Sequence, residues 1–192
     1  MIKTKNVKVY GLQESLVRSG LPMRTGEPED FTRDYLSKEY TKAVKRGRML
    51  GKVKTGTGHD NFLKGIVVQF DLCYPEYFSP QLQRYGYVDI ISSQSKMHNI
   101  LKNGLNQNDF ALPINKSYLD FLNYEIKNEN FKSVINGLPL GFQKWMGIST
   151  NYLQLKTIRQ QRRTHKLQEW GDFCSWIDTL PYFSELTNKN HK

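Results

Sequence analysis

Two polar side chains fall on the apolar face of a predicted helix near the C-terminal end of the sequence. Over residues 150–166, positions 151, 155, 158 and 162 recur at spacings of 4, 3 and 4, which places them on one helix face. Leu155 and Ile158 mark this face as inward, so Asn151 and Arg162 are expected to point inward as well. The opposite face carries Lys156, Arg159, Arg163 and Lys166. A buried arginine needs a carboxylate, a phosphate or carbonyl groups. We therefore expect Arg162 to form an internal salt bridge or to hold an anion or a nucleotide edge.

Two other segments place polar residues beside turn-forming residues. His59 follows a glycine-rich loop over residues 51–58 and can either bond to the backbone or contact a ligand that the glycines allow to approach. The serines of residues 92–95 precede a predicted helix over 97–105. They can cap that helix, or they can donate hydroxyl and backbone hydrogen bonds to a phosphate at its N-terminus.

Common catalytic and metal-binding motifs are absent from the sequence. The stretch KTGTGHD lacks the Gly-Lys-Ser/Thr ending of a P-loop, and neither GxSxG nor HExxH occurs. The four histidines have no metal-ligand spacing, so no metal site is expected. Cys73 and Cys174 give no disulfide framework, and neither lies in the context of a nucleophile.

The stretch over residues 58–98 resembles one signature of the flavin-dependent thymidylate synthases, in a divergent and phage-type branch. That signature starts with Glu-His, passes a phenylalanine-rich strand and ends in Gln-x-x-Arg-His-Arg with a serine beyond it. Here His59 matches the histidine, Gln81 the glutamine and Arg84 the first arginine. On their own, Gln81 can equally be a surface residue and Arg84 a helix C-terminal cap.

The stretch over residues 138–170 is similar to the second signature of that family. The family pattern runs Leu-Pro, then an asparagine that opens a helix, then an arginine followed by Ala-Gln-Trp-Glu. Leu138, Pro139, Asn151, Arg162 and Gln168 fall in register without gaps, while Glu169 and Trp170 occur in swapped order. The two stretches together cover about half of the chain.

The resemblance implies a function and a set of site residues. The family uses FAD, reduced by a nicotinamide cofactor, to transfer a one-carbon unit from methylenetetrahydrofolate to C5 of dUMP. For this chain, the resemblance implies FAD as cofactor and a uridine nucleotide as substrate. If the chain is catalytic, it also implies NADPH and methylenetetrahydrofolate as co-substrates. His59 and Asn151 would bind the cofactor, and Gln81, Arg84, Ser95 and Arg162 would bind the nucleotide. No catalytic side chain is assigned, because the family needs no protein nucleophile. The family is a homotetramer with sites between subunits, so a homo-oligomer is expected.

The sequence departs from the family pattern at several positions. Tyr85 and Gly86 replace the histidine and the second arginine of Arg-His-Arg. The serine beyond the motif falls on Gln94 in a gapless register and on Ser95 or Ser93 only after a shift, and the next arginine falls on Lys96. Lost positive charge in the pocket predicts weaker retention of FAD and slow or absent methylation of dUMP.

Composition limits the class of protein. Lys and Arg total 28 against 18 Asp and Glu, a net charge of +10 that fits anionic small molecules, nucleic acid or simple solubility. No apolar run reaches the ~18 residues of a membrane span, and the first residues lack the apolar region of a secretory signal. We therefore expect no membrane partner, and a location in the cytoplasm, or in the host cytoplasm if the chain is phage-encoded.

The predicted elements favour one α+β domain over residues 1–192. We expect strands at 7–11 and 65–74, and helices at 29–50, 97–105, 117–127, 150–166 and 168–179. Pro75 is expected to open a further helix, and residues 89–95 to be irregular. Helices dominate, so the fold class is α+β, mostly helical with a small antiparallel or mixed sheet, as the resemblance also implies.

Three functions are compatible with these observations. The first is a flavin-dependent thymidylate synthase-like enzyme. The second is a non-catalytic relative that binds or sequesters a nucleotide, which the departures at Tyr85 and Gly86 favour. The third, possible but less favoured, is a basic nucleic-acid-binding protein, whose affinity would fall steeply with salt.

Overall fold

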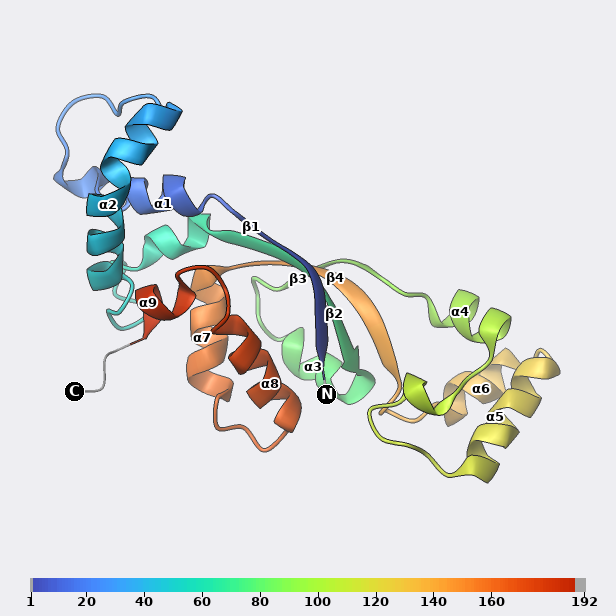
Figure 1. The fold of residues 1–192 in the computed structure, drawn as a ribbon. Helices are drawn as coiled ribbons and strands as arrows, with labels where there is room; N and C mark the ends of the chain where they lie inside the picture. Colours follow the sequence, from blue (N-terminus) through green and yellow to red (C-terminus); the bar gives the residue numbers. More distant parts are fainter. Residues whose placement is uncertain (1, 189–192) are drawn as a thin grey trace. The chain divides into compact units, whose positions relative to one another are not determined.

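The computed structural model describes residues 2–188 and builds them into four strands and a larger set of helices (Figure 1). The strands are β1 (Lys3–Tyr10), β2 (Val67–Pro75), β3 (Asp89–Ser93) and β4 (Gln143–Asn151). The α-helices are α1 (Leu12–Arg18), α2 (Arg33–Leu50), α3 (Ser79–Leu82), α4 (Lys96–Asn103), α5 (Lys116–Lys127), α6 (Phe131–Gly137), α7 (Tyr152–Arg162), α8 (Gln168–Ile177) and α9 (Phe183–Thr187). Within this range, every helix is too short or too polar to cross a membrane.

The four strands form one antiparallel sheet in the order β1-β2-β4-β3, which confirms the expected α+β class with a small sheet. In β2, the alternating side chains of Val68, Phe70 and Leu72 are buried, as the period of a strand requires. Met146 and Ile148 do the same in β4. β1 and β3 are the edges of the sheet, and all five residues of β3 are exposed.

The chain divides into two compact units. The described part of unit 1 comprises residues 2–6 and 70–148, and that of unit 2 comprises residues 7–69 and 149–188. Strands β1, β2 and β4 each contain residues of both units. The candidate site residues are therefore described unit by unit.

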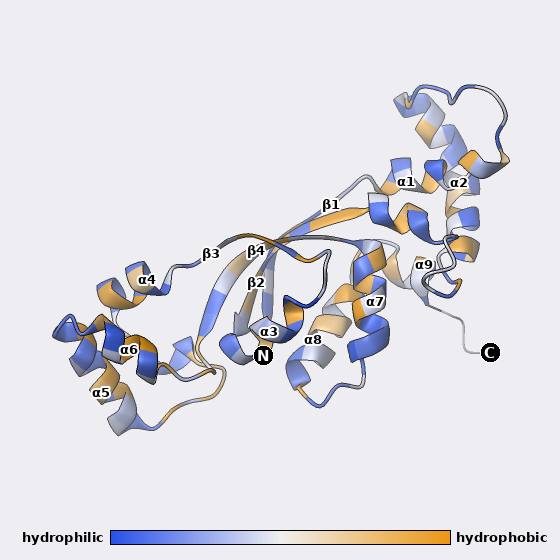
Figure 2. Cartoon of the chain, turned by 180° about the vertical axis from the view of Figure 1, so that it is seen from behind, coloured by the Kyte–Doolittle hydropathy of each residue, from blue (hydrophilic) through white to orange (hydrophobic). Residues whose placement is uncertain are grey.

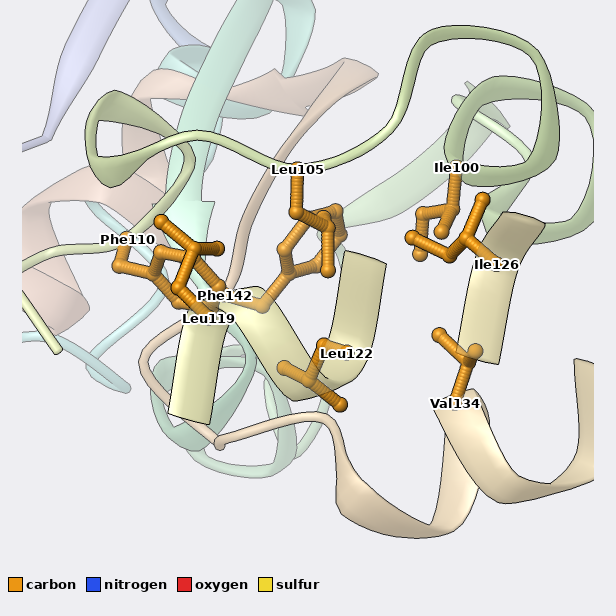
Figure 3. Packing of buried hydrophobic residues seen from close by; sticks show 8 residues of the cluster. All are labelled: Ile100, Leu105, Phe110, Leu119, Leu122, Ile126, Val134 and Phe142. Carbon is orange, nitrogen blue, oxygen red and sulfur yellow. The ribbon is translucent and has the colours of Figure 1, made fainter. Parts of the chain in front are cut away.

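In unit 1, one apolar cluster holds α4, α5 and α6 together (Figure 3). Its buried members are Ile100, Leu105, Phe110, Leu119, Leu122, Ile126, Val134 and Phe142. Phe110 and Phe142 form an isolated antiparallel bridge, and their ring centroids lie 6.0 Å apart in an edge-to-face arrangement. The cluster fixes the helix α4, whose N-terminus carries Ser95.

In unit 2, helices α1, α2, α7, α8 and α9 all contribute buried apolar side chains. α7 mixes apolar and polar residues in its first turns and is hydrophilic in its last ones (Figure 2). Tyr152 in its first turn is fully buried, packs edge-to-face against Phe183 with ring centroids 5.1 Å apart, and donates a hydrogen bond to Pro181 O at 2.7 Å. Farther along, Arg159 forms a two-pronged ion pair with Asp178, at 2.6 and 3.2 Å, which ties α7 to the end of α8.

Two strands and a helix start differ from the sequence-based expectation. Residues 89–93 form strand β3 rather than irregular chain, and β4 was not predicted at all. As expected, a helical segment begins after Pro75, which ends β2 and caps a 3-10 helix over Glu76–Phe78. The short helix α3 follows directly, with Pro80 in its first turn. α7 begins at Tyr152 and not at Thr150, because Thr150 and Asn151 complete β4.

The cluster in unit 1 gives a direct stability prediction. Leu122 is completely buried, so Leu122→Ala should lower the free energy of unfolding by about 2–5 kcal/mol through lost transfer energy and a cavity. Leu112 is 78% exposed, so Leu112→Ala is the matched control and should change stability by less than about 0.5 kcal/mol. Urea denaturation measures both; equal effects would contradict the packing described.

Candidate functional site

Asn151 marks the junction where strand β4 becomes helix α7. Its backbone is extended, and its side-chain Oδ1 accepts the Gln154 N–H at 2.9 Å, which is the N-cap interaction of a helix. The side-chain oxygen of this half-buried residue is thus occupied by the capping hydrogen bond. Its NH2 group has no hydrogen bond within the described residues, so it can serve as a donor to a ligand.

Arg162 is the last residue of α7 and lies against an aromatic ring. Its guanidinium carbon is 4.9 Å from the ring centroid of Trp170, which is fully buried, and Arg162 itself is half-buried. A guanidinium over an indole face is stabilised by the ring quadrupole and keeps its N–H edge for other partners. This places the planar donor group of Arg162 at the end of the same helix that Asn151 begins.

The expectation for Lys156 is wrong. The sequence pattern put it on the polar face of α7, but its side chain is only 2% exposed and its Nζ lies 2.6 Å from Asp60 Oδ2. Nζ also donates to Val53 O at 2.7 Å. A lysine can be buried in this way only because a carboxylate and a carbonyl compensate its lost hydration. Asp60, which sequence reasoning overlooked, is 1% exposed.

His59 lies in the same unit, directly before Asp60. It is exposed, and it follows Gly58, whose φ of +85° belongs to the region that favours glycine. Asp60 then begins the short 3-10 helix over Asn61–Gly65. His59 is therefore an exposed imidazole flanked by a permissive glycine and a fully buried carboxylate. In unit 2 the structure thus collects three expected site residues: His59, Asn151 and Arg162.

Gln81, Arg84 and Ser95 belong to unit 1. Gln81 is half-buried on α3, and Arg84 is exposed just beyond the end of that helix. Tyr85 is buried, with 9% of its surface exposed. Gly86 is exposed; its φ is not positive, and a Cβ added there would meet nothing within 4 Å. The residue that replaces the family's histidine is thus packed inside the unit, and the one that replaces its arginine has room for a side chain.

Ser95 is the N-cap of α4. Its Oγ accepts the His98 N–H at 3.4 Å and lies 3.0 Å from His98 Nδ1, so the capping alternative raised by the sequence is realised. Capping does not exhaust a hydroxyl, which also has a donor hydrogen. If His98 Nδ1 carries a hydrogen, Ser95 Oγ accepts it and keeps its own hydrogen for a ligand; if Nδ1 is bare, the hydroxyl donates to Nδ1 instead.

A cavity of about 230 Å³ lies beside this helix start in unit 1. Its lining includes Ser95 but neither Gln81 nor Arg84. The remaining lining residues are Gln94, Lys96, Asn99, Ile100, Asn103, Gly104, Leu105, Asn106, Asp109, Phe142, Gln143 and Lys144. Most of these side chains are carboxamides or carry charge, so the cavity suits a small polar ligand.

Two lysines of the cavity lining contact the same carboxylate. Lys96 Nζ and Lys144 Nζ lie 3.1 and 3.0 Å from the same oxygen of Glu76, so two ammonium groups share one carboxylate. The group of three carries a net charge of +1, and Asp109, elsewhere in the lining, carries one negative charge. The two ammonium groups can still bind an anionic substituent such as a phosphate. Lys96 was noted in the sequence, as the position on which the family's next arginine falls. Lys144 was not, because it lies on the unpredicted strand β4.

The cysteines and acidic residues do not offer another chemistry. Cys73 and Cys174 are buried, and burial raises the pKa of both thiols, that of Cys174 to about 11. Both therefore stay protonated and unreactive near neutral pH. Across residues 2–188, no group of three or more histidine, cysteine or acidic side chains is arranged to hold a metal ion.

Comparison with solved structures defines the class of fold. The chain is similar to flavin-dependent thymidylate synthases. One such structure, ThyX from Helicobacter pylori complexed with FAD and dUMP, aligns with a TM-score of 0.70 at 15% identity over 97% of both chains. A second structure of Helicobacter pylori ThyX with FAD and dUMP gives 0.70 at 14% identity, over 98% of this chain and 97% of that one. No protein-family model matches the chain, and no curated protein matches it in sequence.

The capping role of Asn151 can be tested by measuring stability alone. Asn151→Ala removes the cap and should lower the free energy of unfolding by about 1 kcal/mol. Asn151→Asp keeps the accepting oxygen and should stay close to the original stability, because aspartate caps as well as asparagine. Urea denaturation of both variants measures the difference, and an aspartate variant as unstable as the alanine variant would contradict the cap.

Proposed function

We propose that the chain is a flavin-dependent thymidylate synthase-like protein that binds FAD and a uridine nucleotide, and that it transfers a one-carbon unit to C5 of dUMP. The observation that carries the proposal is the likeness of fold over 97% of the chain to thymidylate synthases complexed with these two ligands. The identity of 15% leaves the chemistry to be argued from the residues of this chain.

Unit 2 supplies donors that suit a flavin. The free NH2 group of Asn151 can donate to a carbonyl oxygen of the ring system, and the exposed imidazole of His59 can donate or accept at its edge. When bound and reduced by NADPH, FAD would supply the reducing equivalents for the transfer from methylenetetrahydrofolate. The residues' own part is to bind and orient the cofactor.

Unit 1 supplies groups that suit a nucleotide. Lys96, Lys144 and the hydroxyl of Ser95 can bind the phosphate, and the carboxamides of Asn99 and Asn103 can bond to the donors and acceptors of a pyrimidine. Asn99 and Asn103 are four residues apart on α4 and so share one face of the helix. Gln81, Arg84 and Arg162 match positions of the family signatures. On that basis we propose them as further nucleotide contacts.

A second candidate function is binding of the nucleotide without turnover. It is favoured by the burial of Tyr85, which keeps this side chain inside unit 1 where the family has a histidine. Gly86 adds no charge. A protein with this pocket would hold a uridine nucleotide and retain FAD weakly.

Titration with the ligands tests the proposal. Binding of FAD is followed by the change in its fluorescence, and Asn151→Asp, which lacks the NH2 donor, should bind it roughly tenfold more weakly. Lys96→Gln should weaken dUMP binding roughly tenfold while leaving uridine, which has no phosphate, unchanged. Gly86→Arg should fold normally and tighten binding of FAD or dUMP, because the position is open.

The titration and an assay of dTMP formation together have three informative outcomes. Formation of dTMP from dUMP with FAD, NADPH and methylenetetrahydrofolate establishes the enzyme. Binding of dUMP without dTMP formation establishes the sequestering function. A folded protein that binds neither ligand refutes both, and steeply salt-dependent binding of nucleic acid would then support the third function.

We also propose that the chain forms a homo-oligomer, as a tetramer. β3 is an edge strand with apolar side chains at both faces, since Ile90 and Ile91 are 37% and 60% exposed. Such an edge pairs readily with another chain. Light scattering should give four times the 22.5 kDa mass of one chain, and Ile91→Lys should lower it while the exposed control Leu112→Lys does not. A single-chain mass at micromolar concentration would refute the oligomer.

A further inference from the structure

The buried pair of Lys156 and Asp60 joins helix α7 to a segment far away in the sequence. Its two side chains are 2% and 1% exposed, and they meet at 2.6 Å across 96 positions of the chain. Both residues belong to unit 2. The pair is therefore an internal feature of this unit, and the proposed ligand contacts do not use it.

Lys156 holds this segment at both ends. Besides Asp60, its ammonium group binds the carbonyl oxygen of Val53, at 2.7 Å. Between these two points, Thr55 makes one further contact with α7, at 3.4 Å to Gln160 Oε1. Residues 53–60 are thus clamped on α7 chiefly by one side chain.

The segment needs such a clamp because its own backbone is permissive. Gly56 and Gly58 have φ of +94° and +85°, and a Cβ at Gly56 would meet nothing within 4 Å. Glycines in this region have many accessible conformations and lose more entropy on ordering than other residues. Without the clamp, the segment would sample alternatives, and His59 would move with it.

The same helix also carries the second proposed flavin contact. Asn151 caps α7, and Lys156 lies five positions farther along it. We propose that Lys156 is a positioning residue, which holds residues 53–60 on α7 so that His59 is presented to the flavin at a fixed place relative to Asn151. The part that concerns the flavin rests on the proposed function; the clamp itself does not.

The stability of the fold does not by itself require a buried ion pair at this place. Replacing a buried pair by apolar residues of similar volume is often neutral or stabilising, whereas removing one partner is strongly destabilising. An apolar replacement fills the same space but cannot bind the Val53 carbonyl or fix the direction of Asp60. The double variant Lys156→Met with Asp60→Leu therefore separates packing from positioning.

The experiment uses the full chain and two readouts. The first is the rate of tryptic cleavage after Lys54, an exposed residue inside the clamped segment. The second is the dissociation constant for FAD. The double variant should keep its melting temperature, be cleaved after Lys54 at least about tenfold faster, and bind FAD at least about tenfold more weakly. Lys64→Met, at an exposed lysine of the following 3-10 helix, is the matched control and should change neither readout.

The outcomes distinguish the clamp from the proposed function. Unchanged cleavage in a folded double variant overturns the proposal, whatever the FAD result. Faster cleavage with FAD affinity unchanged overturns the positioning of His59 for flavin. Faster cleavage in a protein whose original form binds no FAD leaves the clamp standing and refutes the flavin assignment.

The original protein provides a measurement that needs no variant. If Lys156 clamps the segment, cleavage after Lys54 should proceed no faster than global unfolding of the chain. Rapid cleavage of the native protein after Lys54 would overturn the proposal even if the double variant failed to fold.

Discussion

The N-cap of Asn151 is the interaction on which the arrangement of unit 2 depends. It sets the residue at which β4 ends and α7 begins, and so the rotation of every later side chain about the helix. With this starting point, Lys156 faces Asp60, Arg159 faces Asp178, and Arg162 lies over Trp170. A helix that began one residue earlier would turn each of these side chains by about 100° and separate them from their partners.

The local parts of this arrangement were predictable from the sequence. The spacing of Leu155 and Ile158 indicated the buried face, whereas the predicted helix start at Thr150 was two residues early. Lys156 was misplaced because the pattern assigns charge to the outside, and nothing local identifies a carboxylate 96 positions away as its partner. Burial of a charge is decided by tertiary contacts, which a periodicity does not contain.

The strands of the sheet were likewise predictable only where their own residues mark them. β2 was found because its run of β-branched and aromatic residues is strong, whereas β4 mixes lysine, glycine and threonine among its buried residues. β3 has no buried residue at all, and it forms a strand because it is hydrogen-bonded to β4. The cavity in unit 1 needs residues from α4 and β4, so the sequence could indicate Ser95 and Lys96 but not Lys144 or the space between them. The roles carried by the resemblance, for Gln81, Arg84 and the other expected ligand contacts, remain predictions.

Gly86 offers an experimental handle on unit 1. The position is exposed, has ordinary backbone torsion and empty space around the site of a Cβ, while both native cysteines are buried and their thiols protonated. A cysteine introduced there would be the preferred target of a thiol-directed fluorophore or spin label, without prior removal of Cys73 or Cys174. A reporter at this position would lie two residues from Arg84, close enough to register changes in the surroundings of that guanidinium by emission or line shape.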